Sequence, residues 1–120
     1  MSLYSEDILY HYHHPSHFGT LSYPTCSSDV KNSICGDSIT MEIRLDGGVV
    51  ADIAFSGHGC AISIAAASLL SEFAMNKSKV ELMKIDSDRI MSLLGIEISA
   101  ARLKCALLPL EALHKALEKV

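Results

Sequence analysis

The alternation of apolar and polar positions is strongest in the middle of the chain. From Ile39 to Leu45 every odd-numbered residue is apolar and the intervening ones are polar, which is typical of a strand with one buried face. Asp46-Gly47-Gly48 predicts a tight turn, because glycine accepts the positive φ that such turns need. The apolar residues that follow predict a returning strand. Residues 38–56 are therefore expected to form an antiparallel hairpin.

Helical patterns flank this hairpin. Ser5 is a plausible N-cap for a first helix that ends before Pro15 and has Ile8, Leu9 and Tyr12 on its apolar face. A run rich in alanine and leucine predicts a long helix over residues 61–74, entered through Gly57-His58-Gly59.

The C-terminal part predicts three more helices. Two short ones are expected at 79–83 and 86–94, with Gly95 as a C-terminal stop. The last begins at Ser99, and Pro109 is expected to kink it. Its apolar stripe is Leu103, Ala106, Leu110, Leu113 and Leu117.

The segment 16–37 is rich in Ser, Pro, Gly and Asp and is predicted to be irregular, apart from an extended piece around Gly19–Cys26. The pattern as a whole predicts an α+β fold. A small antiparallel sheet, made of the hairpin 38–56 and an N-terminal strand, would pack against helices in one domain spanning residues 1–120.

Composition argues against two classes of function, membrane proteins and nucleic-acid-binding proteins. Of the 120 residues 49% are hydrophobic and 20% are charged, which is ordinary for a soluble globular protein. No apolar run reaches the roughly 18 residues of a membrane span, and the N-terminus does not resemble a signal peptide. The net charge of −4, with scattered basic residues, argues against nucleic-acid binding. A cytoplasmic protein without membrane contact is expected.

Three of the four cysteines lie where the backbone changes character. Cys35 and Asp37 flank a glycine and can turn toward one ion. Cys60 precedes the long helix, where the helix dipole favours a thiolate, and Cys105 lies near the expected kink. The alternative is that all three are small buried hydrophobes. Their long, unequal gaps match no zinc-finger pattern, so spacing leaves both interpretations open.

Local motifs add a resemblance. Three segments resemble the signature segments of the U-type iron–sulfur scaffolds, the family of the NifU N-terminal domain, IscU and SufU. They are residues 32–37 (NSICGD), 55–63 (FSGHGCAIS) and 102–109 (RLKCALLP). Residues 11–19 (HYHHPSHFG) resemble that family's His-Tyr-x-x-Pro-x-Asn-x-Gly stretch. The four segments occur in the family's order and cover nearly the whole chain.

The resemblance implies a compact α+β domain whose three cysteines converge at one exposed end. Its ligand set would be Cys35, Asp37, Cys60 and Cys105, holding a transient [2Fe–2S] cluster, or zinc in the isolated protein. Thiolates suit both. The implied partners are a cysteine desulfurase and acceptor apoproteins. The chain would then be a scaffold and carrier, not an enzyme.

Several positions depart from the family pattern. Ser33 stands where a proline is common, and Lys104 replaces the histidine that precedes the third cysteine in IscU-type scaffolds, as in the SufU type. The stretch 75–101 is nevertheless too short for the extra segment of SufU-type proteins. Residues 98–102 lack the Leu-Pro-Pro-Val-Lys motif that docks an Hsp70-type chaperone, which argues against that partner.

Two further functions stay open. In a zinc-dependent sulfurtransferase, Cys105 would accept persulfide sulfur from a desulfurase, and the Lys104 context favours this reading. In a structural zinc domain, the metal would only hold the fold, although the hydrophobic fraction suffices for a core without metal.

Other residues carry weaker signals. Lys104 is a candidate for a residue that supports the ligands: it could steady the Cys105 thiolate or pair with Asp37, or it could be a surface lysine. His58 could bond to a ligand or face solvent. A run of histidines is interpreted as a polar helix end more readily than as a metal site; it comprises His11, His13, His14 and His17. Cys26 is interpreted as a structural thiol.

Overall fold

A computed structural model describes residues 5–33 and 36–120. The described residues form five helices and three strands. In chain order these are α1 (Glu6–His13), β1 (Cys26–Asn32), β2 (Asp37–Asp46), β3 (Val49–His58), α2 (Ala61–Ala74), α3 (Lys79–Met83), α4 (Ser87–Leu94) and α5 (Ala100–Leu117).

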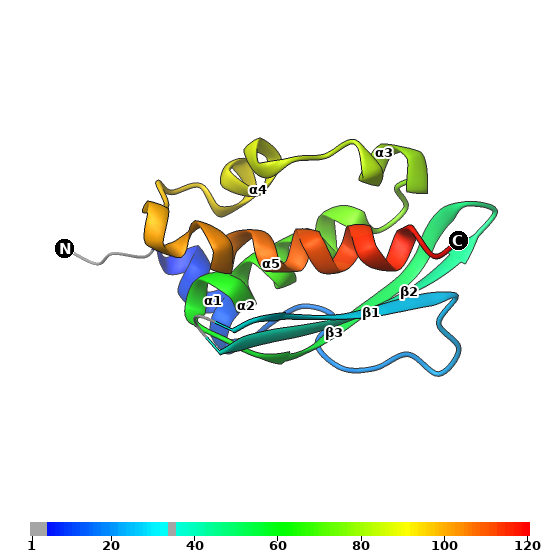
Figure 1. Cartoon of the computed structure of the whole chain (residues 1–120), viewed down its shortest axis with the longest axis horizontal. Coiled ribbons are helices and arrows are strands. Elements are labelled where there is room, and N and C mark those ends of the chain that lie inside the picture. Colours follow the sequence, from blue (N-terminus) through cyan, green and yellow to red (C-terminus); the bar gives the residue numbers. More distant parts are fainter. Residues whose placement is uncertain (1–4, 34–35) are drawn as a thin grey trace.

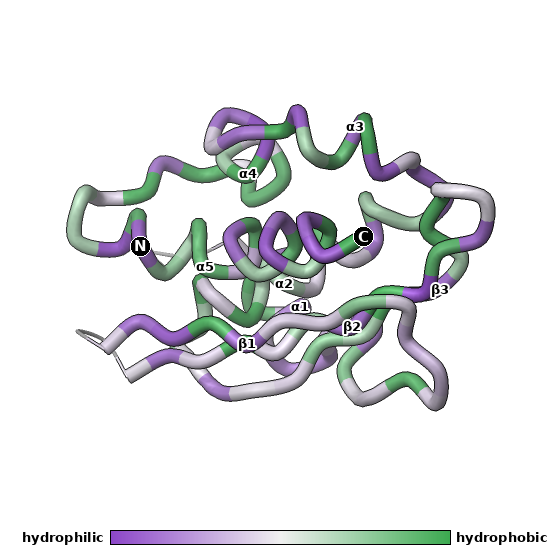
Figure 2. Tube along the Cα trace, turned by 45° about the vertical axis from the view of Figure 1, so that its right-hand side comes forward, coloured by the Kyte–Doolittle hydropathy of each residue, from purple (hydrophilic) through white to green (hydrophobic). Residues whose placement is uncertain are grey.

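The strands form one antiparallel sheet in the order β1-β2-β3. Helices α2 and α5 lie along one face of this sheet, and α3 and α4 form an outer layer beyond them (Figure 1). Hydrophilic residues gather where β1 ends (Figure 2). The α+β class, with a small antiparallel sheet backed by helices, is therefore confirmed.

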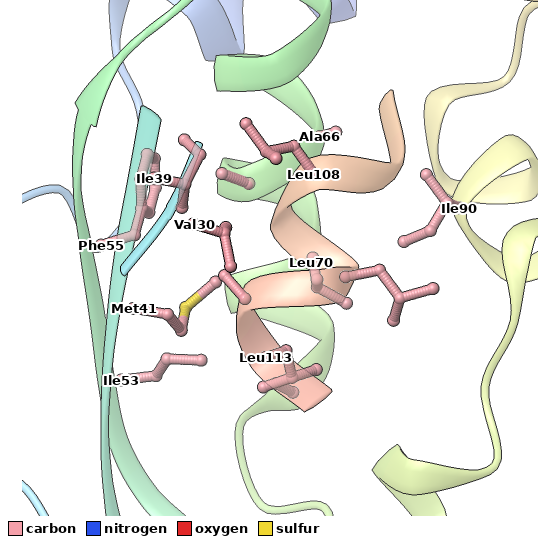
Figure 3. Close-up of a cluster of buried hydrophobic side chains, with 14 of the residues drawn as sticks. Val30, Ile39, Met41, Ile53, Phe55, Ala66, Leu70, Ile90, Leu108 and Leu113 are labelled. Carbon is pink, nitrogen blue, oxygen red and sulfur yellow. The ribbon is translucent and has the colours of Figure 1, made fainter. Parts of the chain in front are cut away.

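The hairpin over 38–56 is confirmed, and it supplies much of the core. Ile39, Met41 and Ile43 are fully buried, and Gly47 and Gly48 turn the chain with φ of 62° and 80°. Side chains of the sheet meet those of α2 and α5, whereas Ile90 of α4 packs from the opposite side of these helices (Figure 3). Each fully buried side chain of this size stabilises the fold by about 1.5–3 kcal/mol.

The expected position of the N-terminal strand was wrong. The third strand is Cys26–Asn32, inside the segment predicted to be irregular, and near Gly19 there is only a single bridge between Phe18 and Phe55. The polar sequence of β1 concealed it. Ser28 occupies a buried position because its hydroxyl donates to the carbonyl of Ala112 in α5, at 2.6 Å.

The first helix is confirmed, but its buried face differs from the prediction. Ser5 caps it by accepting a hydrogen bond from the amide of Ile8 at 3.2 Å. Tyr12 is 39% exposed, and His11 takes the buried place instead. A bond of 2.6 Å between His11 Nδ1 and Ser68 Oγ of α2 satisfies the imidazole there.

The remaining helices agree with the prediction within a residue or two. Helix α2 has the expected bounds, and Gly95 ends α4 with a φ of 70°. Helix α5 continues through the buried Pro109, and its stripe is buried except at Leu103, which is 37% exposed. No helix within the described ranges is long and apolar enough to span a membrane.

Candidate metal centre

Three predicted ligands come from three elements that meet at one place. Asp37 is the first residue of β2, Cys60 is the N-cap of α2, and Cys105 lies in the second turn of α5. One carboxylate oxygen and the two Sγ atoms all lie within 4.8 Å of one another. A fourth predicted ligand, Cys35, lies outside the described residues.

The spacing of these donor atoms fits a small metal centre. Tetrahedral zinc with bonds of roughly 2.3 Å holds its sulfur ligands about 3.8 Å apart. Donors within 4.8 Å of one another therefore need only small inward movements to share one ion. Two thiolates and a carboxylate form a donor set that suits zinc or the iron of an iron–sulfur cluster.

Asp37 has a buried oxygen that lacks a partner. The residue is 5% exposed, and its Oδ2 makes no hydrogen bond with any described residue. A buried carboxylate oxygen without a partner costs free energy, so native structures seldom retain one without a functional reason. A metal ion bound between Asp37 and the two cysteines would give this oxygen its partner.

Cys60 is presented by a bend between β3 and α2. The residue has extended backbone geometry at the N-cap, and its side chain makes no capping hydrogen bond. Helix α2 begins directly behind it, and Ser63 donates to the Cys60 carbonyl at 3.1 Å. The thiol therefore lies at the positive end of a helix of 14 residues, which favours an anionic ligand.

Gly59 permits the close approach of the carboxylate to this bend. A Cβ at this position would lie 3.1 Å from Asp37 Cγ and 2.2 Å from Ser63 Oγ. Sequence reasoning treated Gly59 only as part of a bend and missed this contact. The available signal was a glycine directly before a candidate ligand, which is where close backbone approach is often needed.

We expect Gly59→Ala to weaken zinc binding by roughly tenfold, a loss in the range seen when ligand-orienting contacts are removed. The reason is that the new methyl group displaces the Asp37 carboxylate or the start of α2. Competition with a chromophoric chelator measures the affinity. The double variant Gly59→Ala/Ser63→Ala is the matched control, since it removes the closer clash and leaves the one with Asp37. Zinc affinity unchanged in both variants would contradict the role given to Gly59.

Cys105 is the most enclosed of the three donors. Its exposed fraction is 1%, whereas Cys60 is half-buried. Lys104 precedes it but is exposed, and among the described residues no carboxylate lies within 4.0 Å of its ammonium group. The suggested pair of Lys104 with Asp37 is therefore not formed in this conformation.

The other candidates lie outside the three-donor cluster. His58 is exposed, and its Nδ1 is 3.4 Å from Ser38 Oγ. In the described part of the chain, no group of three or more metal-binding side chains includes a histidine. Cys26 is buried at the start of β1, and this burial raises the pKa of its thiol, which keeps it in the unreactive protonated form.

Comparisons with known proteins agree with this geometry. The family model described as "NifU-like N terminal domain" matches residues 3–120. The zinc-dependent sulfurtransferase SufU of Bacillus subtilis is 36% identical over 135 residues, covering 98% of this chain and 91% of SufU. The iron–sulfur cluster assembly scaffold protein IscU of Thermotoga maritima is 32% identical over 136 residues, covering 98% and 94%.

A solved structure extends the likeness to the fold. The crystal structure of FiSufU from the thermophilic Fervidobacterium islandicum AW-1 superposes with a TM-score of 0.79 at 32% identity. The superposition covers 95% of this chain and 96% of FiSufU. Sequence, fold and the meeting of Asp37, Cys60 and Cys105 thus lead to one conclusion: the chain belongs to the family of NifU-like N-terminal domains, the IscU/SufU scaffolds of iron–sulfur cluster assembly.

Proposed function

We propose that this chain is a scaffold that assembles a [2Fe–2S] cluster on Cys35, Asp37, Cys60 and Cys105 and passes it to acceptor apoproteins. The observation that carries the proposal is the meeting of Asp37, Cys60 and Cys105 within 4.8 Å, with one carboxylate oxygen buried and lacking a partner. The sequence supplies Cys35 as the fourth ligand, two residues before Asp37. A cytoplasmic setting fits, since thiols persist as ligands in a reducing compartment.

The mixed donor set supports a temporary cargo. Thiolates bind iron–sulfur clusters strongly, whereas a carboxylate is a harder and poorer ligand for the same iron. One oxygen ligand among three sulfurs therefore leaves the cluster easier to release than four sulfurs would. In this role the chain carries out no reaction of its own, and a cysteine desulfurase supplies the sulfur.

A second candidate is a zinc-dependent sulfurtransferase, and the name of the B. subtilis relative favours it. In this reaction the attacking thiolate forms a bond to the outer sulfur of the donor persulfide, the donor S–S bond breaks, and the donor cysteine leaves as a thiolate. Cys105 was the expected acceptor. Because it is 1% exposed, it can accept sulfur only if the site opens, whereas the half-buried Cys60 is more accessible.

Anaerobic reconstitution distinguishes the two functions. The purified chain is incubated with iron, cysteine and a cysteine desulfurase, then followed by visible absorption and Mössbauer spectroscopy. For the scaffold we expect a [2Fe–2S] spectrum that is lost when an acceptor apoprotein gains activity. Tightly bound zinc, no cluster, and a persulfide found by mass spectrometry on one of the ligand cysteines would instead establish the sulfurtransferase.

A further inference from the structure

A hollow lies directly beside the metal centre, between the end of β1 and one face of α5. Its volume is about 380 Å³, within the range of small-molecule sites. Strand β1 packs against α5, and residues of both line the hollow. Its lining residues are Lys31, Asn32 and Ser33 from the β1 end and Lys104, Leu107, Leu108 and Glu111 from α5.

The residues that line this hollow carry an excess of positive charge. Lys31 and Lys104 are both exposed, and neither lies within 4.0 Å of a carboxylate belonging to a described residue. Glu111 is the only acidic group among the lining residues, and Lys115 pairs with it at 3.0 Å. In a chain of net charge −4, this is a local concentration of positive charge, which attracts anions.

The hollow also has a small apolar part, formed by Leu107 and Leu108 of α5. Leu108 is 3% exposed, so the partly buried Leu107 offers most of the apolar surface to a short hydrocarbon segment of a ligand. Asn32 and Ser33 are the polar uncharged residues of the lining. Two exposed cations beside a small apolar surface suit a compact organic anion with a carboxylate.

The hollow shares lining residues with a second hollow that includes Asp37 of the metal centre. A second hollow of about 330 Å³ shares residues 31–33 with the first and is further lined by Gly36, Asp37, Ser38 and His58. On the α5 side, Lys104 directly precedes Cys105. Residues at the end of β1 thus line both the lysine-lined hollow and the hollow that includes Asp37.

We propose that the lysine-lined hollow binds a small carboxylate-bearing thiol, with its carboxylate between Lys31 and Lys104 and its thiol directed toward the metal centre. The inference rests on the proposed function only for the direction of the thiol. The carboxylate site stands on the lining residues alone. Such a ligand supplies an external thiolate to a centre that must take up and release its cargo.

Two probes that differ only in the carboxylate test the anion site. N-acetylcysteine carries a carboxylate and a thiol, whereas N-acetylcysteamine carries only the thiol. In NMR titrations of the metal-free chain, N-acetylcysteine is expected to shift the amide signals of residues 31–33 and 104–111, and N-acetylcysteamine is not. Equal shifts from the two probes, or none from either at tens of millimolar, would overturn the proposal.

Lysine variants locate the site. Lys31→Gln and Lys104→Gln should each raise the dissociation constant for N-acetylcysteine by roughly fivefold, the loss expected for one exposed ion pair at the upper end of its range. Lys84→Gln is the matched control, because Lys84 is an exposed lysine that lines a different hollow. The same dissociation constant in wild type and in both hollow variants would overturn the assignment.

The direction of the thiol has its own readout. In cobalt-loaded Asp37→Ala a metal position is open, and an external thiolate that fills it adds a sulfur-to-cobalt absorption band. N-acetylcysteine should produce this band at a concentration about 25-fold lower than N-acetylcysteamine, and Lys104→Gln should reduce the difference to about fivefold. Equal concentrations for the two probes would overturn the placement of the thiol. Failure of cobalt to bind to the wild-type chain would contradict the proposed function, while the metal-free titration still decides the anion site.

Discussion

Replacing Cys105 by serine should lower zinc affinity by about 100-fold or more. Structural zinc sites contribute about 10–16 kcal/mol of binding free energy, so one of four ligands accounts for about 2.5–4 kcal/mol. Each 1.4 kcal/mol corresponds to a factor of ten. Competition against a chromophoric chelator of known affinity gives the constant, and Cys60→Ser should show a loss of similar size because Cys60 belongs to the same cluster.

Cys26→Ser is the matched control for these variants. Cys26 is also buried, at 7% exposure, but it lies at the opposite end of β1 from Lys31 and pairs with Ile43. Its replacement is expected to lower the free energy of unfolding and to leave zinc affinity per folded chain unchanged. Circular dichroism before each titration separates loss of fold from loss of a ligand. If Cys105→Ser and Cys60→Ser both kept the wild-type affinity, as Cys26→Ser should, the metal centre would be disproved.

Local sequence determined most of the elements. The alternation from Ile39 to Leu45, the two glycines of the turn and the stop at Gly95 each act through neighbouring residues, and each prediction was confirmed. Strand β1 was missed because its pairing is set by distant contacts. The bond from Ser28 to the Ala112 carbonyl connects residues 84 positions apart, and no local pattern reveals it.

The metal centre depends even more on tertiary structure. Asp37, Cys60 and Cys105 lie far apart in the chain, and their spacing left open whether the cysteines were ligands or core residues. Only the resemblance of the surrounding motifs selected these residues, together with Cys35, as ligands. The fold then placed Asp37, Cys60 and Cys105 together. The lysine-lined hollow had no sequence signal, because Lys31 and Lys104 are brought to one hollow by the packing of β1 on α5.

The buried oxygen of Asp37 leads to a different expectation for the metal-free chain. Asp37→Ala removes an oxygen that has no partner among the described residues, so we expect the free energy of unfolding of the metal-free chain to rise by about 1–3 kcal/mol. Urea denaturation measures this change. Asp29→Ala is the control, since Asp29 is exposed and its carboxylate accepts a hydrogen bond from Thr40; no comparable rise is expected there.

The same residue should control how quickly the cargo leaves. Asp37→Cys replaces the one hard oxygen ligand by a thiolate, which binds the iron of a cluster more strongly. Transfer of the cluster to an acceptor apoprotein should therefore slow by about tenfold, which corresponds to roughly 1.4 kcal/mol in the activation free energy. Asp37→Ala should also retain the cluster longer, because it removes the oxygen ligand that makes the site releasable. Stopped-flow absorption at the cluster bands gives the rates. Transfer at the wild-type rate in both variants would mean that Asp37 does not govern release of the cluster.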